Sequence, residues 1–252
     1  MTARNILIIG AGIGGLTTAL ALAAKGHEVD IVEQAPALSE VGAGLQVSPN
    51  ASRILIALGL GHRLREAMIS PHEIVLSSGR SLRKIAHVPC GRFAEDRWGA
   101  PYGVMHRADL QTLLLDAVIA HANCNLHLSQ RAQSAGIGSL HQRLNRPVPD
   151  LVVGADGVWS QSRNLVAGAP QPRFTGQVAW RFKVAAEMAR PVLNPANVTA
   201  FLGSKTHLVT YPLEQGKTIN MVAITPGTSP GETWAEHEAA TQRRDLLNAF
   251  AG

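Results

Sequence analysis

The feature that most constrains the fold is a glycine-rich turn directly after a short apolar run near the start of the chain. Residues 5–9 are mostly aliphatic, as in a strand buried on both faces of a parallel sheet. The turn Gly10-Ala11-Gly12-Ile13-Gly14-Gly15 fits the pattern G-x-G-x-x-G. Residues 16–25 then favour a helix and residues 28–32 a second strand. Strand, turn, helix and strand in this order predict one right-handed βαβ unit.

This turn has the chemistry of a dinucleotide site. Gly10 permits the tight turn, Gly12 lets the backbone approach a pyrophosphate, and Gly15 lets helix and strand pack closely. The phosphates would lie at the N-terminus of the helix, beside Gly14. Glu33 follows the second strand, where a carboxylate accepts hydrogen bonds from ribose hydroxyls. The pattern alone leaves both FAD and NAD open.

Composition excludes several classes of protein. Hydrophobic residues make up 46% of the chain and charged residues 16%, which is typical of a packed globular protein rather than a disordered one. The net charge of +5 suits anionic cofactors and carboxylate substrates, but no basic run indicates nucleic-acid binding. Cys90 and Cys124 form no CxxC pair, so we expect neither a metal site nor a disulfide, and a cytoplasmic location. Glycines interrupt the uncharged stretch 6–24, which argues against a membrane segment.

The pattern of apolar and polar residues changes in the second half of the chain. Further elements are expected as strands at 72–77, 102–105 and 151–154 and as helices at 50–58, 109–121 and 233–251. Longer alternating runs then predict antiparallel strands at 177–184, 198–202, 207–213 and 218–224. The predicted fold class is therefore α/β, a Rossmann-like βαβ domain together with a mixed or antiparallel sheet.

Two later motifs carry a family resemblance. They are E-V-G-A-G-L-Q-V-S-P-N-A at 40–51, and Asp156-Gly157-Val158-Trp159-Ser160 with Arg163. The sequence here resembles the single-component FAD-dependent aromatic hydroxylases, such as salicylate and hydroxybenzoate hydroxylases. The likeness continues at residues 106–110, 178–181 and 208–213.

The resemblance implies residue roles around the flavin. Gly44 and its neighbour Val47 would pass beside the isoalloxazine edge, and Arg107 would contact the flavin nucleotide, where a guanidinium suits phosphate oxygens. Asp156 and Gly157 would lie near the pyrophosphate, and Arg163 belongs to the same motif.

The resemblance also implies a reaction, the hydroxylation of a small phenolic acid with NADH or NADPH and molecular oxygen. No second nucleotide motif is present, so NAD(P)H would bind transiently. His207 and Tyr211 are four apart on one expected strand and so share a face, which makes them candidate catalytic residues together with Gln46. Alternatively, His207 is a surface residue and Tyr211 a core aromatic.

The chain departs from the family pattern at two places. A polar stretch bridges residues 128–151, where the family has more strand, and no later Gly-Asp motif appears before residue 252. We expect an FAD-binding domain at 1–170, interleaved with substrate-layer strands near 72–105, and a partial substrate domain at 171–252. Alternatives are a truncated, catalytically silent flavin-binding remnant and an NAD-dependent dehydrogenase. A homodimer is an open option.

Overall fold

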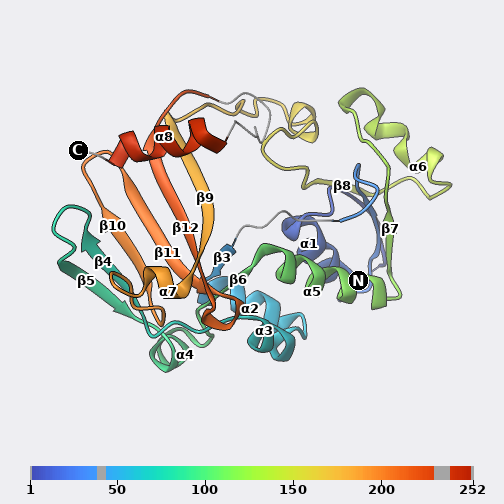
Figure 1. Ribbon diagram of the computed structural model, residues 1–252. Coiled ribbons are helices and arrows are strands. Elements are labelled where there is room, and N and C mark those ends of the chain that lie inside the picture. Colours follow the sequence, from blue (N-terminus) through green and yellow to red (C-terminus); the bar gives the residue numbers. More distant parts are fainter. Residues whose placement is uncertain (1, 39–43, 230–238, 251–252) are drawn as a thin grey trace. The chain divides into compact units, whose positions relative to one another are not determined.

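A computed structural model describes residues 2–38, 44–229 and 239–250 (Figure 1). The chain divides into two compact units, between which it passes several times. The first unit comprises residues 1–41, 55–64 and 108–172, and the second comprises 42–54, 65–107 and 173–252. The mixed α/β fold class predicted from the sequence is confirmed.

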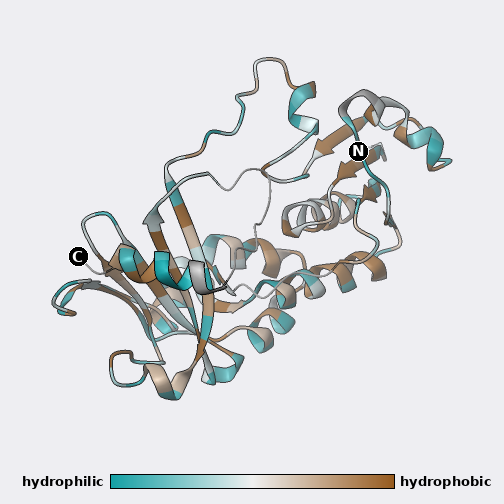
Figure 2. Ribbon diagram, turned by 45° about the horizontal axis from the view of Figure 1, so that its top comes forward, coloured by the Kyte–Doolittle hydropathy of each residue, from teal (hydrophilic) through white to brown (hydrophobic). Residues whose placement is uncertain are grey.

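The first unit is built on a parallel sheet with the strand order β7-β2-β1-β8. The strands are β1 (Asn5–Ile9), β2 (Glu28–Val32), β7 (Cys124–His127) and β8 (Leu151–Gly154). Helix α1 (Ile13–Ala23) connects β1 to β2, as the βαβ prediction requires. Helix α5 (Arg107–Ala120) begins at the boundary of the units and buries Leu110, Leu113, Leu114 and Val118. Figure 2 shows strands near the N-terminus in brown, in keeping with their aliphatic sequences.

The stretch between β7 and β8 is mostly polar in sequence, yet it contributes apolar side chains to the core of the first unit. It folds into a 3-10 helix, η1 (Ser134–Ser139), followed by α6 (Leu140–Arg143). Ile137 and Leu140 are buried in a cluster with Leu7, Ile9 and Val32 of the sheet. Two apolar side chains in an otherwise polar segment therefore cover one face of the parallel sheet.

The second unit contains a six-stranded sheet in the order β5-β4-β10-β11-β12-β9. Its strands are β4 (Glu73–Ser78), β5 (Lys84–Pro89), β9 (Gln177–Ala185), β10 (Val198–Leu202), β11 (His207–Leu213) and β12 (Thr218–Pro226). All neighbours are antiparallel except β4 and β10. A separate two-stranded antiparallel sheet pairs β3 (Gly44–Val47) with β6 (Gly103–His106).

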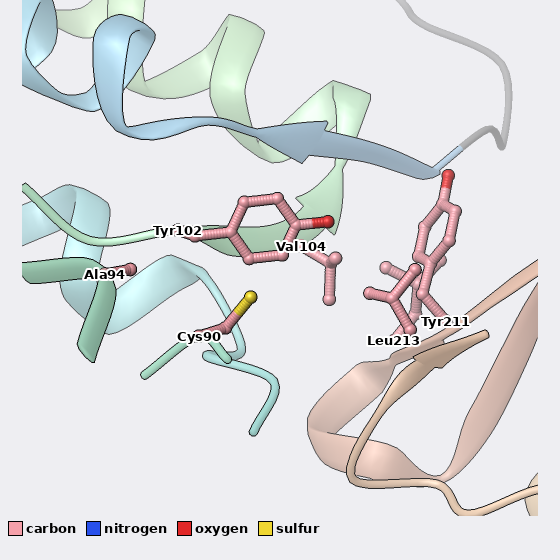
Figure 3. Packing of buried hydrophobic residues seen from close by; sticks show 7 residues of the cluster. Cys90, Ala94, Tyr102, Val104, Tyr211 and Leu213 are labelled. Carbon is pink, nitrogen blue, oxygen red and sulfur yellow. The ribbon is translucent and has the colours of Figure 1, made fainter. Parts of the chain in front are cut away.

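The two faces of this sheet have different partners. On one face Val198, Tyr211 and Leu213 pack against Tyr102 and Val104, together with Cys90 and Ala94 (Figure 3). Ala94 comes from α4 (Arg92–Trp98). The opposite face packs Ile219 against Leu193 and the alanines of α7 (Ala186–Ala189).

The remaining helices connect these layers. They are α2 (Pro49–Ala57), α3 (Gly61–Ala67), η2 (Ser162–Leu165), η3 (Glu214–Gly216) and α8 (Ala239–Phe250). The C-terminal helix was expected at 233–251, of which 233–238 and 251 lie outside the described residues. Within the described ranges, every helix is too short or too polar to cross a bilayer.

Candidate functional site

The glycine turn of the first unit has the geometry that its sequence predicts. Gly10 has a φ of +103°, and a Cβ atom there would lie 2.4 Å from the carbonyl oxygen of Ala155. A Cβ atom at Gly15 would lie 1.9 Å from the carbonyl oxygen of Gly10, so only glycine lets α1 pack this closely on the turn. The turn and the first turn of the helix are thereby fixed by sterics.

Space remains where a phosphate would bind. The N-cap of α1 is Gly12, which has no side chain that could cap the helix. Cβ atoms at Gly12 and Gly14 would meet nothing within 4 Å. The first N–H groups of a helix carry partial positive charge and need acceptors. The described residues therefore fit a dinucleotide pyrophosphate at this helix end.

Glu33 is tied to the same turn. One carboxylate oxygen accepts a hydrogen bond from the N–H of Ala11 at 2.9 Å, and the other accepts one from the N–H of Ala35 at 3.0 Å. The side chain thus braces the turn from the end of β2. Each oxygen retains a further lone pair that can accept a hydrogen bond from a ribose hydroxyl. That contact stays a prediction.

Asp156 lies next to the glycine turn and shapes its own segment. Its carboxylate accepts hydrogen bonds from the Ser160 hydroxyl at 2.6 Å and from the N–H groups of Gln161 and Ser162 at 2.7 and 3.0 Å. Burial raises its pKa, but these hydrogen bonds outweigh burial and hold the pKa of Asp156 below the ordinary value. The Asp156 carboxylate therefore caps the following turn by accepting these three hydrogen bonds.

The rest of this motif is arranged around that cap. Arg163 donates a hydrogen bond from Nη1 to the carbonyl oxygen of Val158 at 2.9 Å, so its guanidinium also stabilises the segment. Gly157 has a φ of +81° with open space beside it. If this motif contacts a pyrophosphate, the backbone at Gly157 is better placed to do so than the two charged side chains.

In the second unit, Gly44 begins β3 at a point where no side chain fits. A Cβ atom there would lie 2.6 Å from Cε2 of Tyr211 and 3.0 Å from Cδ1 of Leu213. The N–H of Gly44 donates to Oδ1 of Asn220 at 3.3 Å. Asn220 is 1% exposed, and its Nδ2 has no partner among the described residues. Asn220 is not among the residues predicted from the sequence, although an amide in the middle of an apolar strand was a signal.

Two further predicted residues lie on β3. Gln46 accepts a hydrogen bond from the Tyr102 hydroxyl at 2.6 Å, and burial raises the pKa of Tyr102. Val47 is 3% exposed and pairs with Gly103 of β6. Val47 is thus a core residue of this strand pair, and its predicted position beside a flavin stays a prediction.

His207 and Tyr211 do share a face of β11, as the period of a strand requires. Tyr211 is 3% exposed and belongs to the core cluster of Figure 3, while His207 is half-buried at the start of the strand. Four residues of strand separate their Cα atoms by about 13 Å. Burial raises the pKa of Tyr211 to about 12, although Arg181 acts in the opposite direction. Tyr211 is therefore a core aromatic residue, and its catalytic role stays a prediction.

Arg107 is the first residue of α5 and is exposed. Its predicted contact with a flavin nucleotide stays a prediction. No group of His, Cys, Asp or Glu side chains suitable for a metal ion occurs among the described residues.

Comparison with known proteins decides the family. The profile of a family described as FAD binding domain matches residues 3–251, which is nearly the whole chain. The chain belongs to this FAD binding domain family. The resemblance inferred from the sequence motifs is thereby confirmed, and FAD is the cofactor of the family.

Curated relatives of this FAD binding domain protein include ring hydroxylases. The chain is 37% identical over 226 residues to 3-hydroxybenzoate 6-hydroxylase 1 of Aquipseudomonas alcaligenes, covering 87% of this chain and 57% of the relative. It is 34% identical over 233 residues to 3-amino-4-hydroxybenzoate 2-monooxygenase of Streptomyces cremeus, covering 90% and 58%. The crystal structure of Klebsiella pneumoniae HpxO complexed with FAD and uric acid is 25% identical, with a TM-score of 0.76, covering 98% of this chain and 62% of that one. The chain thus spans less than two thirds of the length of these proteins.

Proposed function

We propose that this chain provides the FAD-binding unit and the substrate face of a monooxygenase that uses NADH or NADPH to hydroxylate a small aromatic, in particular a phenolic acid. The observation that carries the proposal is that residues from both units match one FAD family, while curated relatives over the same residues are aromatic hydroxylases. A dehydrogenase that shares only the glycine turn would not explain the match across the second sheet.

The first unit supplies the candidate residues for the dinucleotide part of FAD. Gly10, Gly12, Gly14 and Gly15 shape the turn, and the free N–H groups at the start of α1 would bind the pyrophosphate. Glu33 would orient the ribose while it braces Ala11. The motif of Asp156, Gly157 and Arg163 adjoins the turn, because a Cβ atom at Gly10 would meet Ala155 and Asp156.

Residues of the second unit are the candidates for the flavin ring and the chemistry. Gly44 and Val47 would lie along the ring edge, and Arg107 would pair with the nucleotide. When bound, FAD accepts hydride from NAD(P)H and activates oxygen for transfer to the ring. Tyr211 lies in an apolar cluster, and such oxygen transfer requires surroundings that are poor in water.

Three polar side chains are the candidates for contact with the substrate. With a pKa of about 12, the Tyr211 hydroxyl keeps its proton at neutral pH and can donate a hydrogen bond to a substrate oxygen. His207 is half-buried and can accept a phenol proton, which makes an aromatic ring more electron-rich. Gln46 would orient a polar substituent through its amide, whose oxygen already holds Tyr102.

The test uses the purified chain with FAD, NADH or NADPH and a panel of phenolic acids. We expect a yellow protein, substrate-dependent NAD(P)H oxidation and a hydroxylated product. Flavin uptake without product would instead support a catalytically silent flavin-binding protein. A colourless protein that binds NAD would support the dehydrogenase. The ratio of product to oxygen consumed measures how well the aromatic captures the activated oxygen.

Assembly and location extend this proposal. A homodimer is the assembly to test first, by light scattering of the FAD-loaded protein. A cytoplasmic location agrees with the unpaired state of Cys90 and Cys124.

A further inference from the structure

A strip of side chains crosses three strands on one face of the six-stranded sheet. Val209 of β11 lies opposite Val222 of β12, which in turn lies opposite Arg181 of β9. Residues directly opposite one another on neighbouring strands point to the same face. His207 and Tyr211 flank Val209 at two residues on either side, so they point to that face as well. We call these five residues the β11–β9 strip.

The middle of this strip is apolar and not fully covered. Val209 and Val222 are both half-buried, and both pack against the core cluster that contains Tyr211. Two strand spacings, together about 10 Å, separate β11 from β9. An aromatic ring placed over the two valines would thus have the polar groups of β11 on one side and Arg181 on the other.

The charge of Arg181 is available on this face. Its side chain is exposed, and the described part of the chain gives it no hydrogen bond or ion pair. Lys183, two residues further along β9, differs because its Nζ is paired with Glu214 at 3.0 Å. The guanidinium also acts on Tyr211, whose pKa it lowers against the effect of burial. The positive field of Arg181 therefore extends over the strip.

We propose that Arg181 is a specificity-determining residue that binds the carboxylate of an aromatic acid lying on Val209 and Val222. This inference rests on the proposed function and names the substrate group that the site selects. A guanidinium offers a planar fork of donors that matches a carboxylate in bidentate geometry. With the carboxylate held on β9, the opposite side of the ring is directed to β11, where His207 and Tyr211 lie.

The experiment compares benzoate with benzamide, which differ in charge but hardly in shape. Dissociation constants are measured by calorimetry for the full chain, with and without FAD, and for the variants Arg181→Gln, Arg181→Lys and Lys183→Gln. We expect the wild-type chain to prefer benzoate. Arg181→Gln should weaken benzoate binding about tenfold or more and leave benzamide within about twofold, because only the charge-assisted bonds are lost.

The other two variants separate a specific contact from a general field. Arg181→Lys should recover part of the benzoate affinity, since it keeps the charge and loses the fork. Lys183→Gln should leave both affinities within about twofold, because its charge is already paired. Equal losses for Arg181→Gln and Lys183→Gln, or a wild-type chain without preference for benzoate, would overturn the proposal.

The carboxylate contact of Arg181 and the proposed monooxygenase activity can be refuted separately. A chain that takes up FAD and hydroxylates neutral phenols, yet shows no role of Arg181 in benzoate binding, refutes this inference alone. A chain that selects benzoate through Arg181 but never binds FAD supports the inference and refutes the proposed monooxygenase. Circular dichroism of each variant confirms that a loss of affinity is not a loss of fold.

Discussion

Replacement of Glu33 by alanine should weaken FAD binding and also loosen the glycine turn. In the structure the carboxylate accepts two backbone hydrogen bonds, from Ala11 at 2.9 Å and from Ala35 at 3.0 Å. Ala11 is fully buried, so water cannot easily replace the lost acceptor. Any bonds from ribose hydroxyls would be lost in addition.

The magnitude follows from these bonds. A hydrogen bond to a charged group contributes about 1.5–3 kcal/mol, and a buried N–H left without a partner costs about 1–3 kcal/mol. We therefore expect Glu33→Ala to lower the free energy of unfolding by about 2–4 kcal/mol. The affinity for FAD should fall by about one to two orders of magnitude, since the turn is no longer held in its binding geometry. Glu33→Gln keeps one acceptor oxygen, so its stability and its affinity for FAD should lie between those of the wild-type chain and of Glu33→Ala.

The assay is a titration of each variant with FAD, followed by quenching of flavin fluorescence, beside a denaturation curve of the FAD-free protein. Gln34→Ala is the matched control, because residue 34 is exposed and adjoins Glu33 in the chain. Reduced stability with an unchanged dissociation constant for FAD would show that Glu33 only braces the turn. No change in either quantity would refute the reasoning altogether.

Further predictions concern the glycine turn, Arg107 and the motif around Asp156. Gly15→Ala should unfold the first unit, because its Cβ would lie 1.9 Å from a backbone oxygen, whereas Gly14→Ala has open space and should keep the fold but lose FAD affinity; circular dichroism and FAD titration distinguish them. Arg107→Ala and Asp156→Ala should reduce flavin retention on gel filtration, while Arg143→Ala should not, and equal losses for all three would indicate general destabilisation. Because the pKa of Asp156 is lowered by folding, its contribution to stability is present above its ordinary pKa of about 4 and is lost as the pH falls through the lower folded value. Asp156→Asn should therefore flatten the acid limb of the stability curve in chemical denaturation between about pH 2 and 5.

Local patterns predicted most of the regular elements. The run at 5–9, the glycine turn and the run at 28–32 became β1, the start of α1 and β2, because strand and helix periods are legible over a few residues. The strands from residue 177 onward were predicted for the same reason. The strands β3, β5 and β7 were missed, because polar residues or proline interrupt their apolar runs, whereas β8, an uninterrupted aliphatic run as short as β3 and β7, was predicted. The short helices α3 and α4 were missed as well.

The candidate sites were harder to predict because contacts between distant residues decide them. The sequence placed Glu33 beside a ribose, but not its bonds to Ala11 and Ala35. The bond from Gly44 to Asn220 joins residues 176 positions apart, which no local pattern can reveal. Arg181 was noticed only as part of a motif, because the register of β9 with β12 is what places it on the face of Tyr211.

The segment between β7 and β8 covers one face of the parallel sheet in the first unit. Ile137 and Leu140 cover Leu7, Ile9 and Val32, so the strand that leads into the glycine turn stays dry on that face. On the same face Asp30 is 7% exposed, and its carboxylate is 2.8 Å from both His127 Nε2 and Arg146 Nε. A buried carboxylate is tolerated only when it is paired in this way.

Both the apolar cover and the pairing of Asp30 lie within the first unit, as do the glycine turn and Glu33. The groups assigned to aromatic chemistry lie instead in the second unit, on and around β11. Substitutions in the glycine turn and at Glu33 should therefore change flavin retention, and those on the β11–β9 strip should change the binding of aromatic acids. Flavin content and benzoate affinity, measured on one set of variants, report separately on the glycine turn with Glu33 and on the β11–β9 strip.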